Sequence, residues 1–286
     1  MRERDPWIQK RQVGWRLRTL REQAGRKQHE VAAEKEWSVS KVIRIENATV
    51  HVSISDLRSL LADYRLDEGE TAALLDAARA SRREPWLDDY GDLATPRLRR
   101  AVAYESAAGH IRQFQLQIVP GVLQTEPYAR AVLSMFFPED RLDGAVAVRM
   151  ERRRRLLDQD PPRMDVVVDE SVLLRAVGGA DTMRGQLDHL LTIAEHDWLS
   201  LSVVPLAAGA HLGLVGSFAL LDLEPDVGIG TVLDIEPGLG EEYLSDRDHE
   251  LVETYRRHYD DLAKVAVGGE DALAILRRCR SQLAAG

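Results

Sequence analysis

A stretch near the N-terminus, QHEVAAEKEWSVSKVIRIENA at residues 28–48, constrains the fold more than any other part of the chain. It predicts two short helices, over residues 28–35 and 39–47, joined by a turn. Ser38 is a favourable N-cap for the second helix, because its hydroxyl can accept a hydrogen bond from an exposed backbone N–H. The turn holds Lys35-Glu36, where a tight turn usually has glycine. The pair is either a helix-turn-helix with an unusual turn or an ordinary helical hairpin.

The interior residues of this pair favour a helix-turn-helix. In that motif the first helix holds the second at a steep angle, which requires a small residue where the two cross. Ala32 supplies the small residue, and Val42 and Ile45, three positions apart, supply an inner apolar face for the second helix. An ordinary hairpin with a solvated polar face would not need an N-cap, a small crossing residue and a spaced apolar pair all at once. Their presence together favours the helix-turn-helix.

The opposite face of the second helix is predicted to enter a major groove. Val39, Ser40 and Lys41 form its exposed first turn, and Arg44, one turn later, can reach a phosphate or a guanine edge. Gln28 opens the first helix, where it can donate to a backbone phosphate. The residues predicted to bind DNA are Gln28, Ser38, Val39, Ser40, Lys41, Arg44 and Asn47.

The rest of the chain divides into segments of different character. Residues 1–10 are predicted to be a basic N-terminal arm, which either follows the DNA or is a solvated tail. Residues 11–81 carry five short helical patterns and predict an all-α domain, and the Pro-, Gly- and Asp-containing residues 82–104 predict a linker. Residues 105–286 mix helical and strand patterns without strict alternation. We therefore predict an α+β chain whose second domain has a mainly antiparallel sheet flanked by helices.

Charge is distributed unevenly along the chain. The net charge of −9 argues against a nucleic-acid partner, but residues 1–50 carry 12 Lys/Arg against 7 Asp/Glu. Residues 201–250 carry 1 Lys/Arg against 10 Asp/Glu. One end of the molecule therefore suits phosphate and the other would be repelled by it, unless the clustering is chance.

Several classes of protein are disfavoured by what the sequence lacks. No apolar run approaches the roughly 20 residues that span a bilayer, and the lone Cys279 fits a reducing cytoplasm, so a cytoplasmic, nucleoid-associated location is expected. No nucleotide-binding or nucleophile motif has its proper spacing, so neither catalysis nor a cofactor is expected. His189 and His196 could share a helix face, but they lack a third metal ligand. The run Arg152–Arg155 favours a solvated helix face with local ion pairs.

Residues 11–81 resemble the Xre/Cro-type helix-turn-helix domain through LRTLREQAG, QHEVAAE, WSVSKVIRIENA and VSISDLRSLL. WLDDYGDL, IRQFQLQIVPGVLQTEPYARAVL and TVLDIE further resemble the actinobacterial WhiJ-like, antitoxin-like regulators, which carry a large C-terminal domain of poorly defined function. The chain departs from the usual pattern at Lys35-Glu36, in place of an apolar residue and glycine, and at Ala48, where glycine is common. Asn47 is expected to adopt the left-handed conformation instead.

This resemblance implies a sequence-specific transcription regulator, expected to be a repressor, and a small partner protein encoded nearby. A head of this size reads one half-site, so a homodimer on a palindromic double-stranded DNA operator is expected. The acidic segment favours a C-terminal domain that docks the partner protein. The alternative is a small-molecule effector in a pocket of that domain formed around Trp198, Phe218 and Tyr243.

Overall fold

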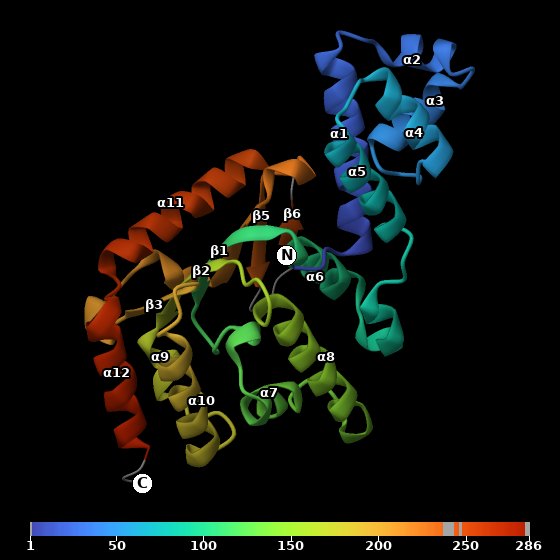
Figure 1. The fold of residues 1–286 in the computed structure, drawn as a ribbon. Coiled ribbons are helices and arrows are strands. Elements are labelled where there is room, and N and C mark those ends of the chain that lie inside the picture. The colour runs from blue at the N-terminus through green and yellow to red at the C-terminus, as the bar shows by residue number, and fades with distance from the viewer. Residues whose placement is uncertain (1, 237–242, 246–247, 284–286) are drawn as a thin grey trace.

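The computed structural model describes residues 2–236, 243–245 and 248–283 (Figure 1). Its first five helices form a compact unit, which we call the head. They are α1 (Pro6–Gln23), α2 (Gln28–Glu34), α3 (Val39–Glu46), α4 (Ile54–Asp63) and α5 (Glu68–Ala80). Four of them begin at a side-chain cap: Asp5 accepts a hydrogen bond from the Trp7 N–H, and Ser38, Ser53 and Asp67 each accept one from a backbone N–H three residues later.

One apolar cluster holds the head together. Ala32 of α2 is 2% exposed, and Val42 and Ile45 of α3 are each 4% exposed, so the predicted crossing residue and inner face are confirmed. Gly14 of α1 lies directly against the end of α3. A Cβ at residue 14 would lie 2.7 Å from the carbonyl oxygen of Ile45, so α1 and α3 pack with their backbones in close approach.

The remainder of the chain is the C-terminal domain, built from one sheet and surrounding helices. Its helical elements are η1 (Trp86–Leu93), α6 (Pro96–Ser106), η2 (Gly121–Leu123), α7 (Glu126–Leu133), α8 (Glu139–Leu157), α9 (Glu170–Leu174), α10 (Ala180–Ile193), η3 (Leu206–Ala208), η4 (Leu212–Val215), η5 (Pro225–Val227), α11 (His249–Val265) and α12 (Gly269–Gln282). Its strands are β1 (Ala108–Gln115), β2 (Arg163–Asp169), β3 (Leu199–Val204), β4 (Ser217–Leu223), β5 (Thr231–Glu236) and β6 (Tyr243–Ser245).

The sheet is mixed, with strand order β3-β2-β1-β4-β5-β6. The pairs β1/β4, β4/β5 and β5/β6 are antiparallel, whereas β1/β2 and β2/β3 are parallel. The two parallel connections carry helices, α7 and α8 in the first and α9 and α10 in the second, as parallel neighbours require. The α+β fold class is confirmed, and the sheet has a larger parallel part than the expected mainly antiparallel arrangement.

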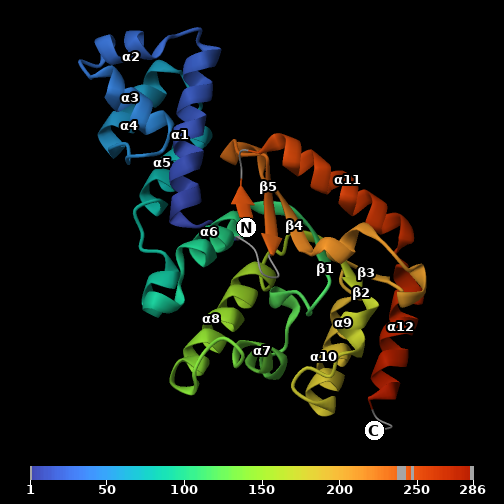
Figure 2. The same cartoon turned by 180° about the vertical axis from the view of Figure 1, so that it is seen from behind.

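Helices cover both faces of this sheet (Figure 2). α11 lies on one face, where Tyr259 and Leu262 pack with Phe114 of β1 and Phe218 of β4. The other face is covered by α6, α7, α8, α10 and α12, which contribute to the largest apolar cluster. Trp198 and Phe218, two of the three residues expected around a pocket, do not share one within the described part of the chain, because Trp198 packs against the large cluster and Phe218 packs under α11. Only the backbone of Tyr243 is described.

The first turns of α1 belong to the C-terminal domain. Residues 6–10 were expected in a loose arm, but α1 begins at Pro6, and the Asp5 carboxylate accepts a hydrogen bond from the Trp7 N–H at 2.8 Å. Ile8 is completely buried in the large cluster of the C-terminal domain, while Leu17, further along the same helix, is buried in the head. One continuous helix therefore contributes to both apolar cores, and the expectation of a loose arm is wrong.

Candidate nucleic-acid interface and the contact between the domains

The outer face of α3 is open to solvent. Its exposed residues recur at helical spacing and are Val39, Ser40, Ile43, Arg44 and Asn47. Val39 is 41% exposed and Ile43 is 37% exposed, so two large apolar side chains share this face with polar ones. Ser38 caps the helix, accepting a hydrogen bond from the Lys41 N–H at 3.2 Å. Five of the residues predicted to bind DNA therefore lie on or beside one accessible surface: Ser38, Val39, Ser40, Arg44 and Asn47.

Ile43 was not among the residues predicted from the sequence. It follows the buried Val42, and on a helical projection it lies on the same exposed edge as Val39, one turn earlier. The spacing of Val42 and Ile45 already defines the inner face, so Ile43 could have been assigned to the outer face from the sequence. Apolar side chains at such positions can contact the methyl group of thymine.

Lys41 is held differently from the other predicted residues. Its ammonium lies 2.8 Å from the Asp56 carboxylate of α4 and 3.7 Å from the centre of the Trp37 ring. The side chain is 35% exposed. A contact between Lys41 and a phosphate would therefore replace its ion pair with Asp56, whereas Arg44 donates to the Ser40 carbonyl oxygen and forms no ion pair with the residues that the structure describes.

Gln28 takes part in a polar network inside the head. Its side-chain amide donates to Glu46 at 2.7 Å, and Glu46 also accepts two hydrogen bonds from Arg21, at 2.6 and 3.0 Å. The side chains of Arg21 and Glu46 are 9% and 4% exposed. The hydrogen bond to Glu46 is the main cause that raises the pKa of the Arg21 guanidinium. This network ties together α1, α2 and α3, and it leaves Gln28 a second amide hydrogen.

The turn between α2 and α3 closes with the hydrogen bonds of a Schellman motif. The Trp37 N–H donates to Ala32 at 2.8 Å and the Glu36 N–H donates to Ala33 at 3.3 Å. Glu36 occupies the position that favours glycine, with φ 56°. Lys35 is fixed by an ion pair with Asp63 at 2.5 Å, so the turn is anchored to α4.

A second Schellman motif ends α3. The Ala48 N–H donates to Ile45 at 3.0 Å and the Thr49 N–H donates to Arg44 at 2.9 Å. Ala48, with φ 54°, adopts the left-handed conformation, and Asn47 has φ −84°. The expectation that Asn47 would take this conformation is wrong, because its N–H still donates to Ile43 in helical geometry and the reversal comes one residue later.

The motif VPGVLQTEPYARA, at residues 119–131, supports a buried loop. Gln124 is completely buried, donates to the Val119 carbonyl oxygen at 2.8 Å and accepts from Arg149 at 2.8 Å. The Tyr128 hydroxyl accepts from the Val119 N–H at 3.2 Å. Gln186 of α10 satisfies two further backbone groups of the same loop. These residues satisfy backbone groups that would otherwise be buried without partners, so their role here is structural.

The histidines considered as metal ligands do not share a site. His189 accepts a hydrogen bond from Arg153 at 3.2 Å, and burial, followed by the charge of Arg153, lowers the pKa of its imidazole. His196 instead stacks on Trp198, with ring centres 5.9 Å apart. Across the ranges that the structure describes, no three His, Cys, Asp or Glu residues gather closely enough to hold a metal ion. Across the same ranges, no helix has the length and apolarity needed to span a membrane.

Polar contacts and the ring of Trp15 help to fasten α1, with Arg4 just before it, to the C-terminal domain. Asp226, in η5, accepts hydrogen bonds from Arg4 at 2.7 and 3.0 Å and from Gln12 at 2.7 Å. Trp15 packs so closely on Gly228 that a Cβ at residue 228 would lie 1.9 Å from its ring. Gly228 has φ 69° and can adopt this turn without strain. The head is therefore attached through a specific surface as well as through the chain.

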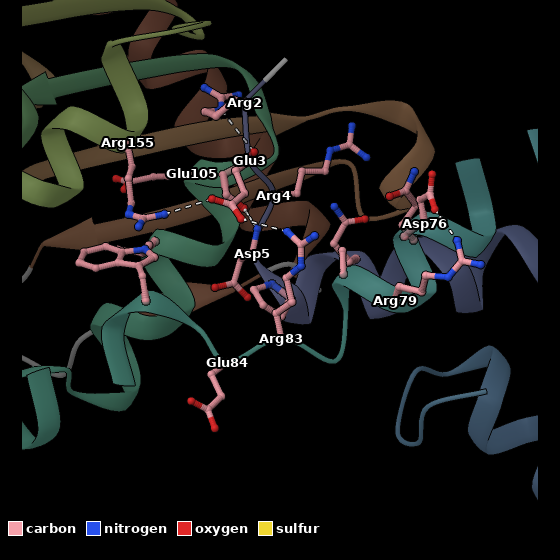
Figure 3. Close-up of a pocket in the computed structure, with 18 of the residues that line it drawn as sticks. Arg2, Glu3, Arg4, Asp5, Asp76, Arg79, Arg83, Glu84, Glu105 and Arg155 are labelled. Carbon is pink, nitrogen blue, oxygen red and sulfur yellow. Dashed lines mark hydrogen bonds and ion pairs between the residues drawn. The ribbon is translucent and has the colours of Figure 1, made fainter. Parts of the chain in front are cut away.

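A cleft of about 840 Å³ lies beside this attachment. It is lined by the segment before α1, by α5 and the residues after it, and by α6 and α8 (Figure 3). Head and C-terminal domain therefore both contribute to its walls. We call it the interdomain cleft.

Comparisons with known protein families divide the chain at the same place. A helix-turn-helix domain matches residues 12–74, and a domain of unknown function (DUF5753) matches residues 98–278. Neither the curated proteins nor the solved structures that were compared include one that matches the chain. Because the second match covers more than half of the sequence, the chain belongs to the DUF5753 family and carries its domain behind an N-terminal helix-turn-helix DNA-binding domain.

Proposed function

We propose that the protein is a sequence-specific transcriptional repressor whose C-terminal domain controls how the head meets DNA. The observation that carries this proposal is the exposed outer face of α3, which combines Val39 and Ile43 with Ser40 and Arg44 on a capped helix. Arg44 would donate to a guanine or a phosphate, and the two apolar side chains would contact thymine methyl groups. Gln28 would use its remaining amide hydrogen on the DNA backbone.

The protein would bind its operator as a homodimer. One head presents a single short recognition helix, which reads only a half-site. Two heads about one helical turn apart would combine their contacts on a palindrome. Sedimentation of the free protein and of its complex with operator DNA tests this arrangement, which a monomer in both states would contradict.

The acidic segment gives less support to a basic partner protein than its composition suggests. Asp222 pairs with Arg112 at 2.6 Å, Asp226 pairs with Arg4 at 2.7 Å, and Asp234 pairs with Arg97 at 2.5 Å. These carboxylates are neutralised within the chain. The interdomain cleft favours instead a small-molecule effector as the regulatory input, because an occupant would contact both head and C-terminal domain.

A small regulatory protein is a second candidate for this input. Four large apolar side chains between β3 and β4 are well exposed: Leu206 (56%), Leu212 (42%), Leu214 (56%) and Val215 (74%). Exposed apolar side chains that gather on one segment are a common feature of protein-docking surfaces. A copurifying small protein would favour this candidate, and a retained organic ligand would favour the cleft.

The test of DNA binding begins with selection of an operator from genomic fragments, followed by fluorescence anisotropy at a stated salt concentration. Arg44→Ala should weaken operator binding by about 1–3 kcal/mol if Arg44 reads a guanine. Arg277→Ala is a matched control, because Arg277 is an exposed arginine of α12 that pairs with Glu270. Equal affinity of the Arg44→Ala variant and the wild type would show that α3 does not read DNA.

A further inference from the structure

We propose that the interdomain cleft is an anion-binding site, and that the Glu3 carboxylate occupies the position of an external phosphate or carboxylate group. The site would take a small anionic metabolite between Arg83 and Arg155 (Figure 3). Binding itself does not depend on the proposed DNA-binding function; its effect on operator affinity rests on that function.

Half of the charged residues that line the cleft, six of twelve, form tight pairs with one another. Asp226 holds Arg4, Glu105 holds Arg152 at 2.5 Å, and Asp76 holds Arg79 at 2.6 Å. These pairs are intramolecular and form part of the cleft wall. A looser contact in the same cleft places Glu3 between the guanidinium groups of Arg83 and Arg155.

The geometry around Glu3 is that of a weakly bound anion. Its carboxylate lies 3.5 Å from Arg83 and 3.3 Å from Arg155, longer than the roughly 2.7–2.9 Å of a strong charge-assisted hydrogen bond. The side chains of Glu3 and Arg83 are 66% and 69% exposed, and that of Arg155 is 35% exposed. Exposed pairs of this length stabilise a fold very little, so an external anion can displace Glu3.

The guanidinium of Arg155 is held in place more firmly than that of an arginine in an ordinary surface ion pair. Arg155 donates through Nε to Glu151 at 2.7 Å, and its guanidinium lies 5.1 Å from the centre of the Trp86 ring. The carboxylate and the indole fix the orientation of the guanidinium, which leaves its terminal nitrogens for the anion. The arginine is therefore positioned before any ligand arrives.

The size of the cleft indicates the class of ligand. A volume of about 840 Å³ is within the range of roughly 300–1,000 Å³ that holds metabolites and cofactors. A guanidinium pair with one aromatic neighbour suits a small organic molecule that carries a phosphate or a carboxylate. The segments that line the cleft, at the start of α1, along α5 and on α6 and α8, lie mainly away from α2 and α3, so its anion is not the DNA backbone (Figure 1).

The two arginines come from different parts of the molecule. Arg83 follows α5 of the head, and Arg155 is on α8 of the C-terminal domain. An anion bound by both would hold the head in the position seen here. It would favour whichever DNA-binding state has this geometry, and DNA would change the anion affinity by the same factor.

Isothermal titration of the full chain with inorganic phosphate and, separately, with citrate tests the site and distinguishes the two anion sources. Glu3→Gln should raise the affinity for at least one probe by about 5-fold, because it removes the internal competitor. Arg155→Ala and Arg83→Ala should each lower it by 10-fold or more in the Glu3→Gln background. Arg277→Ala, on α12, should change nothing.

Unchanged affinity in Glu3→Gln, or binding that survives both arginine substitutions, would overturn the proposal and indicate an adventitious ion only. No heat of binding from either probe in the Glu3→Gln variant would overturn it equally. Operator affinity is measured separately, with and without the probe that binds. Anion binding that depends on the arginines but leaves operator affinity unchanged would uphold the site and refute its regulatory effect. Loss of operator binding in all conditions would refute the proposed function alone.

Discussion

Glu46→Ala should destabilise the head strongly although no apolar side chain is removed. Glu46 accepts hydrogen bonds from Arg21 at 2.6 and 3.0 Å and from Gln28 at 2.7 Å, and its side chain is only 4% exposed. Without this carboxylate, the buried Arg21 guanidinium keeps its charge because the pKa of arginine lies far above neutrality. The variant would therefore contain a buried cation that has lost its buried anion and keeps the longer contact with the exposed Glu22.

The expected loss is about 3–5 kcal/mol of unfolding free energy, the usual effect of removing one partner of a buried pair. The double variant Arg21→Met with Glu46→Met should recover most of this loss, since it leaves no charge behind and replaces both groups by apolar ones. Arg21 also donates to the Arg26 carbonyl oxygen at 2.8 Å, so the recovery should be incomplete. Glu22→Gln is the control, because the exposed Glu22 meets the same Arg21 at 3.3 Å and should cost nothing measurable.

Urea denaturation followed by far-UV circular dichroism measures these differences, with equal slopes required for comparison. A loss below about 1 kcal/mol in Glu46→Ala would contradict the burial argument. A double variant as unstable as the single one would show that the unpaired charge is not the cause. Operator affinity, measured below the denaturation range, then tells whether the network also orients α3.

Three further changes test other contacts of the fold. Gly14→Ala should cost about 1–3 kcal/mol because its Cβ would meet backbone oxygens of α3, whereas Gly185→Ala in α10, with no atom within 4 Å of its Cβ, should be neutral or stabilising in the same denaturation assay. Glu36→Gly and Ala48→Gly relieve left-handed residues with φ of 56° and 54°, and each should raise the unfolding free energy by up to about 1 kcal/mol. Ile8→Ala should cost about 2–5 kcal/mol in thermal or urea unfolding, and hydrogen exchange should localise the loss to the C-terminal domain.

The helix-turn-helix could be predicted from the sequence because its signals are local. The Ser38 cap and the buried pair Val42 and Ile45 depend on spacing within one helix, and the structure confirms them. The same spacing places Arg44 on the outer face. The spacing of residues along one helix could not reveal which residue a long side chain contacts. Lys41 pairs with Asp56 in α4, and Gln28 donates to Glu46 in α3.

The contact between the domains could not be predicted for a different reason. Residues 1–10 have the composition of a solvated arm, and nothing within that segment shows that Ile8 is buried. Its burial depends on the distant surface formed by α6 and η5, where Trp7 contacts Tyr104 of α6 with ring centres 5.4 Å apart. The parallel half of the sheet was likewise hidden, because strand direction follows from crossover connections and not from the strand sequences.

The course of α1 explains how a distant event could change DNA binding. Its 18 residues form a rod of about 27 Å, with Ile8 buried in one core and Leu17 in the other. Because Ile8 and Leu17 are fixed in different cores, a change in the angle of α1 at the C-terminal domain would also move the head. The contacts that set its angle lie along one side, at Asp226 and Gly228, and the interdomain cleft adjoins them. An occupant of the cleft that favours one angle of α1 would change the spacing of the two heads in the proposed dimer, and its effect is limited by its difference in affinity for the two angles.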